Sequence, residues 1–138
     1  MIGIVVTGHG SFPNGIYESV RLIAGDVEKL EVVPFEEDQD KLEEALLKAI
    51  EVVDEGEGVV CFADLAGGTP FNVSSRIAST RDQVHVIGGT NSPMLLSGLF
   101  QRQQPIDSFV TSIISEGKES IKAFEVKKKR AVNESDGI

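Results

Sequence analysis

Cysteine is nearly absent from this sequence, since Cys61 is the only one among 138 residues. A single cysteine excludes a disulfide within the chain and fits a reducing compartment such as the cytoplasm. Long apolar runs are also missing, because none approaches the roughly 20 residues needed to cross a bilayer. The first residues lack the basic start of a signal peptide. We therefore expect a cytoplasmic protein without a membrane span.

Basic residues are scarce relative to acidic ones. The chain has 13 lysines and arginines against 22 aspartates and glutamates, which gives a formal net charge of −9. A negative surface repels phosphate backbones, which argues against general binding of DNA or RNA. The same surface is compatible with docking of a basic protein partner.

The rest of the composition is that of an ordinary globular protein, with 41% apolar and 25% charged residues. A chain of this length forms one domain that buries roughly two-thirds of its unfolded surface. From Lys127 onward the sequence KKKRAVNESDGI is polar and charged, which predicts a frayed tail. We therefore predict one domain over residues 1–126 and a polar tail over residues 127–138.

Segments with strand and helix periodicity alternate along the chain. We expect strands at residues 2–6, 30–35, 59–63 and 84–87, and helices at residues 14–25, 40–53, 70–79, 94–102 and 108–116. The second helix starts at Asp38 or Asp40, and Asp107 or Ser108 caps the last one. This order predicts an α/β fold with an open, mostly parallel sheet and helices on both faces. Pro34 places the second strand at an edge, and the flavodoxin-like order 2-1-3-4 follows if the first and third strands are neighbours. Apolar and polar side chains alternate over residues 121–126, which predicts a last short strand.

The first strand ends at a histidine between two glycines, in the sequence VVTGHGSF. Gly8 and Gly10 permit a sharp turn. Such a turn presents His9 at the carboxyl edge of the sheet, where open α/β folds bind their ligands. His9 is therefore a candidate for chemistry.

The third strand ends in a second glycine-rich turn, DLAGGTPFN, which begins at Asp64. Thr69 followed by Pro70 is typical of an N-cap and a first helical residue. We expect Gly67, Gly68 and Thr69 to form a helix N-terminus whose free backbone N–H groups suit a phosphoryl oxyanion.

The 2-1-3-4 order would bring His9 and Asp64 together at the topological switch point of the sheet. A neutral imidazole has one nitrogen that carries a proton and one that is free to attack. A carboxylate that accepts a hydrogen bond from the protonated nitrogen fixes the tautomer and aims the free nitrogen outward. We therefore expect Asp64 to orient His9.

Three stretches carry a specific resemblance: VVTGHGSFPNGIYESVRLIAG, FADLAGGTPFNVSSRIA and GGTNSPMLL. Together they resemble the mannose-family (mannose, fructose, sorbose and N-acetylgalactosamine type) IIA component of the bacterial phosphoenolpyruvate-dependent sugar phosphotransferase system. The match runs from Met1 to about Val126. It implies that His9 accepts a phosphoryl group from the carrier protein HPr and passes it to the IIB component. Asp64 matches the aspartate paired with the family's histidine, and Thr69 takes the place of a hydroxyl near the phosphoryl site.

The resemblance also implies an enzyme of the phosphotransferase class with a phosphohistidine intermediate. No metal and no cofactor are expected, because the phosphoryl donor is already a phosphohistidine. Membrane-embedded IIC and IID components are implied as indirect partners, and they choose the sugar. A homodimer is implied as well, in which the last, antiparallel strand is exchanged between the two copies. The segment at residues 121–126 is the candidate for that strand.

Three alternative functions compete with this interpretation. A phosphoryl donor module of a dihydroxyacetone kinase shares the domain type but usually continues into further carrier domains. A regulatory or dinucleotide-binding module is weakly indicated, since the run from Gly8 nearly reproduces G-x-G-x-x-G, with Glu36 or Glu37 as a ribose ligand, but Pro13 replaces the third glycine. A hydrolase triad of Ser11, His9 and Asp64 has no G-x-S-x-G elbow to support it.

Four further residues have simpler structural interpretations. His85 lies inside a strand and is expected to be structural, and Cys61 is expected to be a small core residue rather than a nucleophile. Arg21 and Arg76 are expected to be solvated or to pack on helices, although either could border the site.

Overall fold

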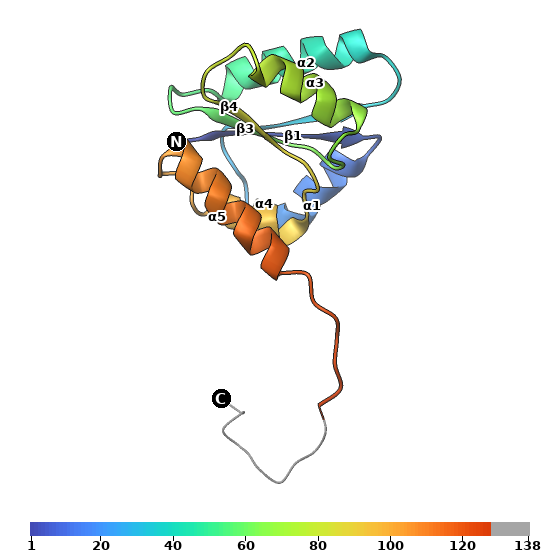
Figure 1. The fold of residues 1–138 in the computed structure, drawn as a ribbon, viewed down its shortest axis with the longest axis vertical. Coiled ribbons are helices and arrows are strands. Elements are labelled where there is room, and N and C mark those ends of the chain that lie inside the picture. Colours follow the sequence, from blue (N-terminus) through green and yellow to red (C-terminus); the bar gives the residue numbers. More distant parts are fainter. Residues whose placement is uncertain (128–138) are drawn as a thin grey trace.

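A computed structural model describes residues 1–127 and builds them from alternating strands and helices (Figure 1). In chain order the elements are β1 (Gly3–His9), α1 (Phe12–Ala24), β2 (Leu30–Phe35), α2 (Gln39–Val53), β3 (Val59–Phe62), α3 (Thr69–Ala78), β4 (Val84–Ile87), α4 (Ser92–Leu99) and α5 (Ile106–Glu119).

The four strands form one parallel sheet in the order β2-β1-β3-β4. This confirms the predicted α/β class, the 2-1-3-4 order and the edge position of the strand that contains Pro34. In the β1–β2 register Thr7 lies beside Val33 and His9 beside Phe35. Because the strands are parallel, β1 and β3 both run toward the same edge of the sheet.

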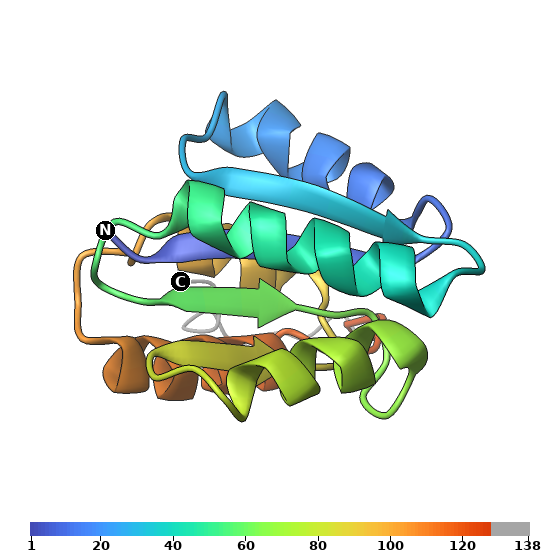
Figure 2. The ribbon, with the colours of Figure 1, turned by 90° about the horizontal axis from the view of Figure 1, so that it is seen from above.

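Helices cover both faces of the sheet, as predicted. α2 and α3 lie on one face, and α1, α4 and α5 lie on the other (Figures 1 and 2). The alternation of β1 divides its side chains between the two layers. Val5 joins the core under α2 and α3, whereas Ile4 and Val6 join the core under the other three helices.

Arg102 is buried and binds backbone carbonyls at the end of the sheet opposite His9. Its guanidinium donates from Nε to the Ile2 carbonyl at 2.8 Å, and from its two terminal nitrogens to the carbonyls of Glu28 and Lys29 at 2.7 Å each. These bonds connect the segment after α4 with the beginning of β1 and the loop before β2. Burial lowers the pKa of Arg102.

Several helix boundaries differ from the sequence-based predictions. Gly68 is the N-cap of α3 and Thr69 its first residue, so the prediction of Thr69 as the N-cap is wrong. Pro70 fits the second helical position, where no N–H is needed. Of the two aspartates proposed to start the second helix, Asp38 is the N-cap of α2, and its carboxylate accepts hydrogen bonds from the N–H groups of Asp40 and Lys41 at 2.9 and 3.2 Å.

The predicted last strand does not form within this chain. Residues 121–127 carry neither helix nor strand, and they lead away from the body after α5 (Figure 1). Ile121, Phe124 and Val126 are 77%, 89% and 80% exposed. A strand is completed by hydrogen bonds to a neighbour, and these residues pair with none of the strands that the structure describes. Residues 128–138 of the predicted tail lie outside the described residues, so the domain boundary remains a prediction.

No helix among the described residues is long and apolar enough to cross a bilayer.

Candidate active site

The carboxyl ends of β1 and β3 bring His9 and Asp64 into direct contact. His9 is the last residue of β1, and Asp64 lies two residues after the end of β3. The ring nitrogen Nδ1 of His9 lies 2.8 Å from Asp64 Oδ2, and the backbone N–H of His9 donates to the same oxygen at 2.9 Å. The aspartate side chain is 10% exposed and the histidine side chain 46% exposed. A fixed carboxylate therefore supports an imidazole that is open to a partner.

The hydrogen bond between the two side chains selects one tautomer of His9. An ionised carboxylate can only accept, so Nδ1 carries the proton and Nε2 keeps its lone pair. Burial alone would raise the pKa of the Asp64 carboxyl, but hydrogen bonds from the backbone and ring of His9 and from the N–H of Leu65 outweigh it and hold that pKa below its ordinary value. Asp64 is thus charged wherever the protein is folded near neutral pH.

Two glycines make this close approach possible. A Cβ at Gly8 would lie 2.7 Å from the ring of Phe12 and 3.0 Å from the carboxyl carbon of Asp64. A Cβ at Gly68 would lie 3.1 Å from Cε1 of His9. A side chain at Gly8 would displace Phe12 or Asp64, and one at Gly68 would shift the His9 ring by a few tenths of an ångström, so the space around the site favours glycine at both positions.

The turn after Asp64 places free backbone donors beside the pair. Gly67 has a positive φ of 88°, and its carbonyl accepts from the side-chain amide of Asn72 at 3.0 Å, which closes the turn. Within residues 1–127 the N–H groups of Thr69 and Phe71, in the first turn of α3, donate to no protein acceptor. Free N–H groups at a helix start favour an anion. The three residues predicted to bind phosphoryl, Gly67, Gly68 and Thr69, thus surround a helix N-terminus next to His9.

A substitution at Gly68 tests the close contact with the imidazole. We expect Gly68→Ala to slow any reaction at His9 by roughly three- to tenfold, because the ring must shift by a few tenths of an ångström and small misplacements of reacting groups are costly. The Cβ added in Gly15→Ala meets nothing within 4 Å, so this variant is the matched control. Equal reaction rates for the two variants, measured with each at the same concentration, would contradict the prediction.

Phe35 is a site residue that the sequence did not indicate. Its ring forms a T-shaped pair with the His9 imidazole, with centroids 5.8 Å apart and an interplanar angle of 79°. Its carbonyl accepts the N–H of Gly10 at 2.7 Å, which connects the end of β2 to the turn after His9. The signal that could have found it is the register between the two strands, since residues side by side in a parallel pair share a face.

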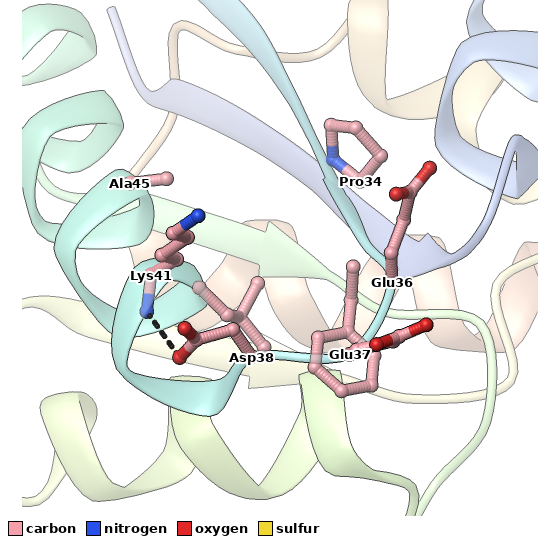
Figure 3. A pocket seen from close by; sticks show the side chains of 8 residues that line it. Pro34, Glu36, Glu37, Asp38, Lys41 and Ala45 are labelled. Carbon is pink, nitrogen blue, oxygen red and sulfur yellow. Dashed lines mark hydrogen bonds between the residues drawn. The ribbon is translucent and has the colours of Figure 1, made fainter.

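Glu36 and Glu37, the ribose ligands of the dinucleotide alternative, lie in the loop between β2 and α2. With Pro34, Phe35, Asp38 and Lys41 they line a hollow of about 650 Å³ (Figure 3). The dashed line in that view is the capping hydrogen bond from the Lys41 N–H to Asp38. Phe35 is the residue that this hollow shares with the His9 site. The turn at Gly8, on which the dinucleotide alternative depends, does not line the hollow.

The remaining candidates have other partners. Arg21 lies 3.6 Å from both Glu18 and Asp26, and the Arg76 guanidinium lies 3.8 Å from a Glu43 oxygen.

His85, Cys61 and Ser11 are also not brought into the His9–Asp64 pair. His85 lies on β4, with its Nε2 atom 3.6 Å from Asp107. Cys61 is fully buried, which raises the pKa of its thiol to about 12, so it is no nucleophile at neutral pH. Ser11 precedes α1, and its side chain makes no capping hydrogen bond.

The comparisons with known proteins agree on one family. The family model described as "PTS system fructose IIA component" matches residues 3–114. The fructose-specific EIIA component of Bacillus subtilis (strain 168) is 31% identical over 105 residues, which are 75% of this chain and 72% of that protein. The mannose-specific EIIAB component of Escherichia coli (strain K12) is 30% identical over 130 residues, 91% of this chain. The chain spans only 40% of that longer relative.

Solved structures extend the likeness to the fold. The crystal structure of phosphotransferase system component EIIA from Streptococcus agalactiae superimposes with a TM-score of 0.82 at 31% identity, over 89% of this chain and 97% of that one. The mannose/sorbose-specific IIA subunit from Enterococcus faecalis has a TM-score of 0.80 at 21% identity, over 94% of this chain and 98% of that one. At this level of identity the second likeness shows the fold alone. Because the family model covers most of the sequence, the chain belongs to the mannose family of IIA components of the sugar phosphotransferase system.

Proposed function

We propose that this protein is a phosphocarrier, in which Nε2 of His9 accepts a phosphoryl group from phospho-HPr and passes it to a IIB component for sugar uptake and phosphorylation. The observation that carries the proposal is the exposed imidazole whose Nδ1 atom is held 2.8 Å from a mostly buried carboxylate. This arrangement leaves Nε2 with a free lone pair, on an imidazole that is 46% exposed.

The transfer step balances with these groups alone. The Nε2 lone pair of His9 forms a bond to phosphorus while the phosphorus–nitrogen bond of the donor breaks and returns its electron pair to the donor imidazole. The His9 ring then has substituents on both nitrogens and carries a positive charge. Asp64 holds the Nδ1 proton and offsets that charge, so it serves as orienter and counter-ion and takes up no proton.

The first turn of α3 is the proposed cradle for the phosphoryl oxygens. The free N–H groups of Thr69 and Phe71 are the donors, Gly67 and Gly68 shape the turn, and the Thr69 hydroxyl is the additional donor implied by the family. The helix dipole alone contributes about 0.3–1 kcal/mol, so the hydrogen bonds themselves supply most of the binding.

The proposed partners follow from this role. HPr and the IIB component exchange the phosphoryl group with His9 directly, in the cytoplasm, and membrane-embedded IIC and IID components use it indirectly. The net charge of −9 favours partners with a basic docking face.

Phosphoryl transfer from phosphoenolpyruvate through the general phosphotransferase proteins tests the proposal. The protein should gain one acid-labile phosphate in an HPr-dependent manner and lose it on addition of an accepting IIB component. The proposal is contradicted if the protein stays unlabelled with active HPr while a known IIA component is labelled in the same mixture.

We also propose a homodimer in which residues 121–126 of one copy pair with the free edge of β4 in the other. β4 has only β3 as a neighbour among the described strands, and the side chains of Ile121, Phe124 and Val126 are exposed in the single chain. Edge strands and exposed apolar side chains of this kind are usually covered. Pairing across two copies would satisfy both features at once.

Substitution of Phe124 by aspartate tests this assembly. We expect wild-type protein to sediment as a dimer and Phe124→Asp to weaken its dissociation constant at least about tenfold, since a charge would have to be buried in the interface. Phe100→Asp is the matched control, because Phe100 is an exposed phenylalanine, 69% accessible, at the end of α4. A wild-type protein that sediments as a monomer at all concentrations would contradict the assembly.

A further inference from the structure

Phe35 is placed beside His9 by the sheet itself. The two residues are the last register pair between β1 and β2, and paired residues in a parallel ladder point to the same face. The rings therefore meet edge to face at 5.8 Å, a geometry that aromatic pairs favour.

The position of the phenyl ring is fixed from behind. Phe35 packs against the core cluster between the sheet and α2, whose buried members include Val33, Leu42 and Leu46. The backbone of Phe35 is held as well, by the 2.7 Å hydrogen bond from Gly10. The Phe35 ring is thus held by the core on one side and contacts the imidazole on the other.

Three features limit the orientation of the His9 ring. Asp64 holds Nδ1, Phe35 packs against the ring, and the space beside Cε1 is small, since a Cβ added at Gly68 would lie 3.1 Å from it. A single hydrogen bond to Asp64 would leave the ring free to tilt about that bond. The phenyl ring of Phe35 and the small space beside Gly68 reduce this freedom, and Nε2 is the ring nitrogen without a hydrogen bond among the described residues.

We propose that Phe35 is a positioning residue for phosphoryl transfer at His9, an inference that rests on the phosphocarrier function proposed above. Its ring keeps Nε2 aligned for attack and separates the imidazole from the hollow between β2 and α2, which Phe35 also lines. Without the phenyl ring, this hollow would open toward the imidazole and allow it to tilt. The effect should therefore fall on the rate at saturating donor and not on the donor concentration that gives half the maximal rate.

The experiment compares Phe35→Leu, Phe35→Tyr and Val33→Ala. Leucine keeps the apolar contact with the core but removes the aromatic pair, and tyrosine keeps the aromatic ring. Val33 lies on the same strand and in the same core cluster, one pleat away beside Thr7, so Val33→Ala reports destabilisation of β2 alone. Phosphorylation rates are measured with phospho-HPr, and the nitrogen chemical shifts of His9 are measured by NMR before any phosphorylation.

We expect Phe35→Leu to reduce the saturated rate about fivefold, which is the range for loss of an aromatic pair, and to move the His9 nitrogen shifts toward a mixture of tautomers. Phe35→Tyr and Val33→Ala should stay within about twofold of wild type. A Phe35→Leu variant with wild-type rate and shifts, or a Val33→Ala variant as slow as Phe35→Leu, overturns the inference.

Two further results keep the inference separate from the proposed function. Wild-type protein that phospho-HPr does not label defeats the phosphocarrier function, and the NMR comparison still decides whether Phe35 orients His9. If Phe35→Leu does not fold, the NMR spectrum of the wild-type protein is used to test the contact between the two rings. Cross-relaxation between the Phe35 ring protons and the His9 ring protons supports the pair, and its absence overturns it.

Discussion

Replacing His9 by asparagine should abolish phosphorylation by phospho-HPr. Asparagine can donate from Nδ2 to Asp64 as the imidazole does from Nδ1, so the turn after β1 keeps its main hydrogen bond. The variant has no Nε2 and no other nucleophile at this place. We expect labelling to fall by about 10⁵- to 10⁶-fold, the scale seen when an enzyme loses its nucleophile. The measurement is acid-labile phosphate per protein, followed by intact mass.

His85→Asn is the matched control for this experiment, because His85 is the second of only two histidines in the sequence. It lies on β4 beside Asp107, outside the His9–Asp64 pair. We expect His85→Asn to be labelled at the wild-type rate and His9→Asn to keep the wild-type circular dichroism spectrum. Normal labelling of His9→Asn, or loss of labelling in His85→Asn, would show that the phosphorylated residue is not His9.

The juxtaposition of His9 and Asp64 could be anticipated from sequence because it depends on topology alone. A buried apolar strand that stops at a glycine-flanked polar residue places that residue at the carboxyl edge of the sheet. Two such strands, next to each other in the order 2-1-3-4, bring their last side chains together. No detail of packing is needed, and this is why residues 55 positions apart in the chain are found 2.8 Å apart.

The contact with Phe35 could not be anticipated in the same way. It depends on the register between β1 and β2, and a shift of one residue would have turned Phe35 to the other face. The capping role of Gly68 was missed for a different reason. Threonine before proline is a strong N-cap signal, but Gly68 already has the extended backbone that an N-cap requires, with φ −79° and ψ 170°.

The segment at residues 121–126 shows a third limit of local sequence patterns. Its alternation is that of a strand, but a strand is completed only by hydrogen bonds to a neighbour. Among residues 1–127 the segment pairs with no strand, and it carries no regular structure. The sequence pattern therefore describes a capacity for pairing, and a second copy is the proposed source of the partner edge.

Replacing Asp64 by asparagine should slow phosphorylation of His9 by about 10²- to 10³-fold. The carboxylate accepts three hydrogen bonds, from the N–H and Nδ1 of His9 on Oδ2 and from the N–H of Leu65 on Oδ1. An amide has only one acceptor oxygen, so neither orientation of asparagine satisfies all three donors. With its NH₂ group toward His9, asparagine favours the tautomer that carries the proton on Nε2, where the attack must occur. In a serine protease the equivalent change costs about 10⁴-fold, because the imidazole there also accepts a proton.

The pH dependence of stability separates this effect from simple unfolding. The pKa of Asp64 is lowered in the folded protein, so its interactions contribute fully above the unfolded value of about 3.9 and are lost as the pH falls through the lowered folded value. Asp64→Asn should therefore lower the unfolding temperature near pH 7 and lose less stability than wild type on acidification below about pH 4. Asp107→Asn is the control, since Asp107 is the exposed carboxylate of the other histidine–aspartate pair, at 3.6 Å. Wild-type phosphorylation rates in Asp64→Asn would mean that the imidazole selects its tautomer without the carboxylate.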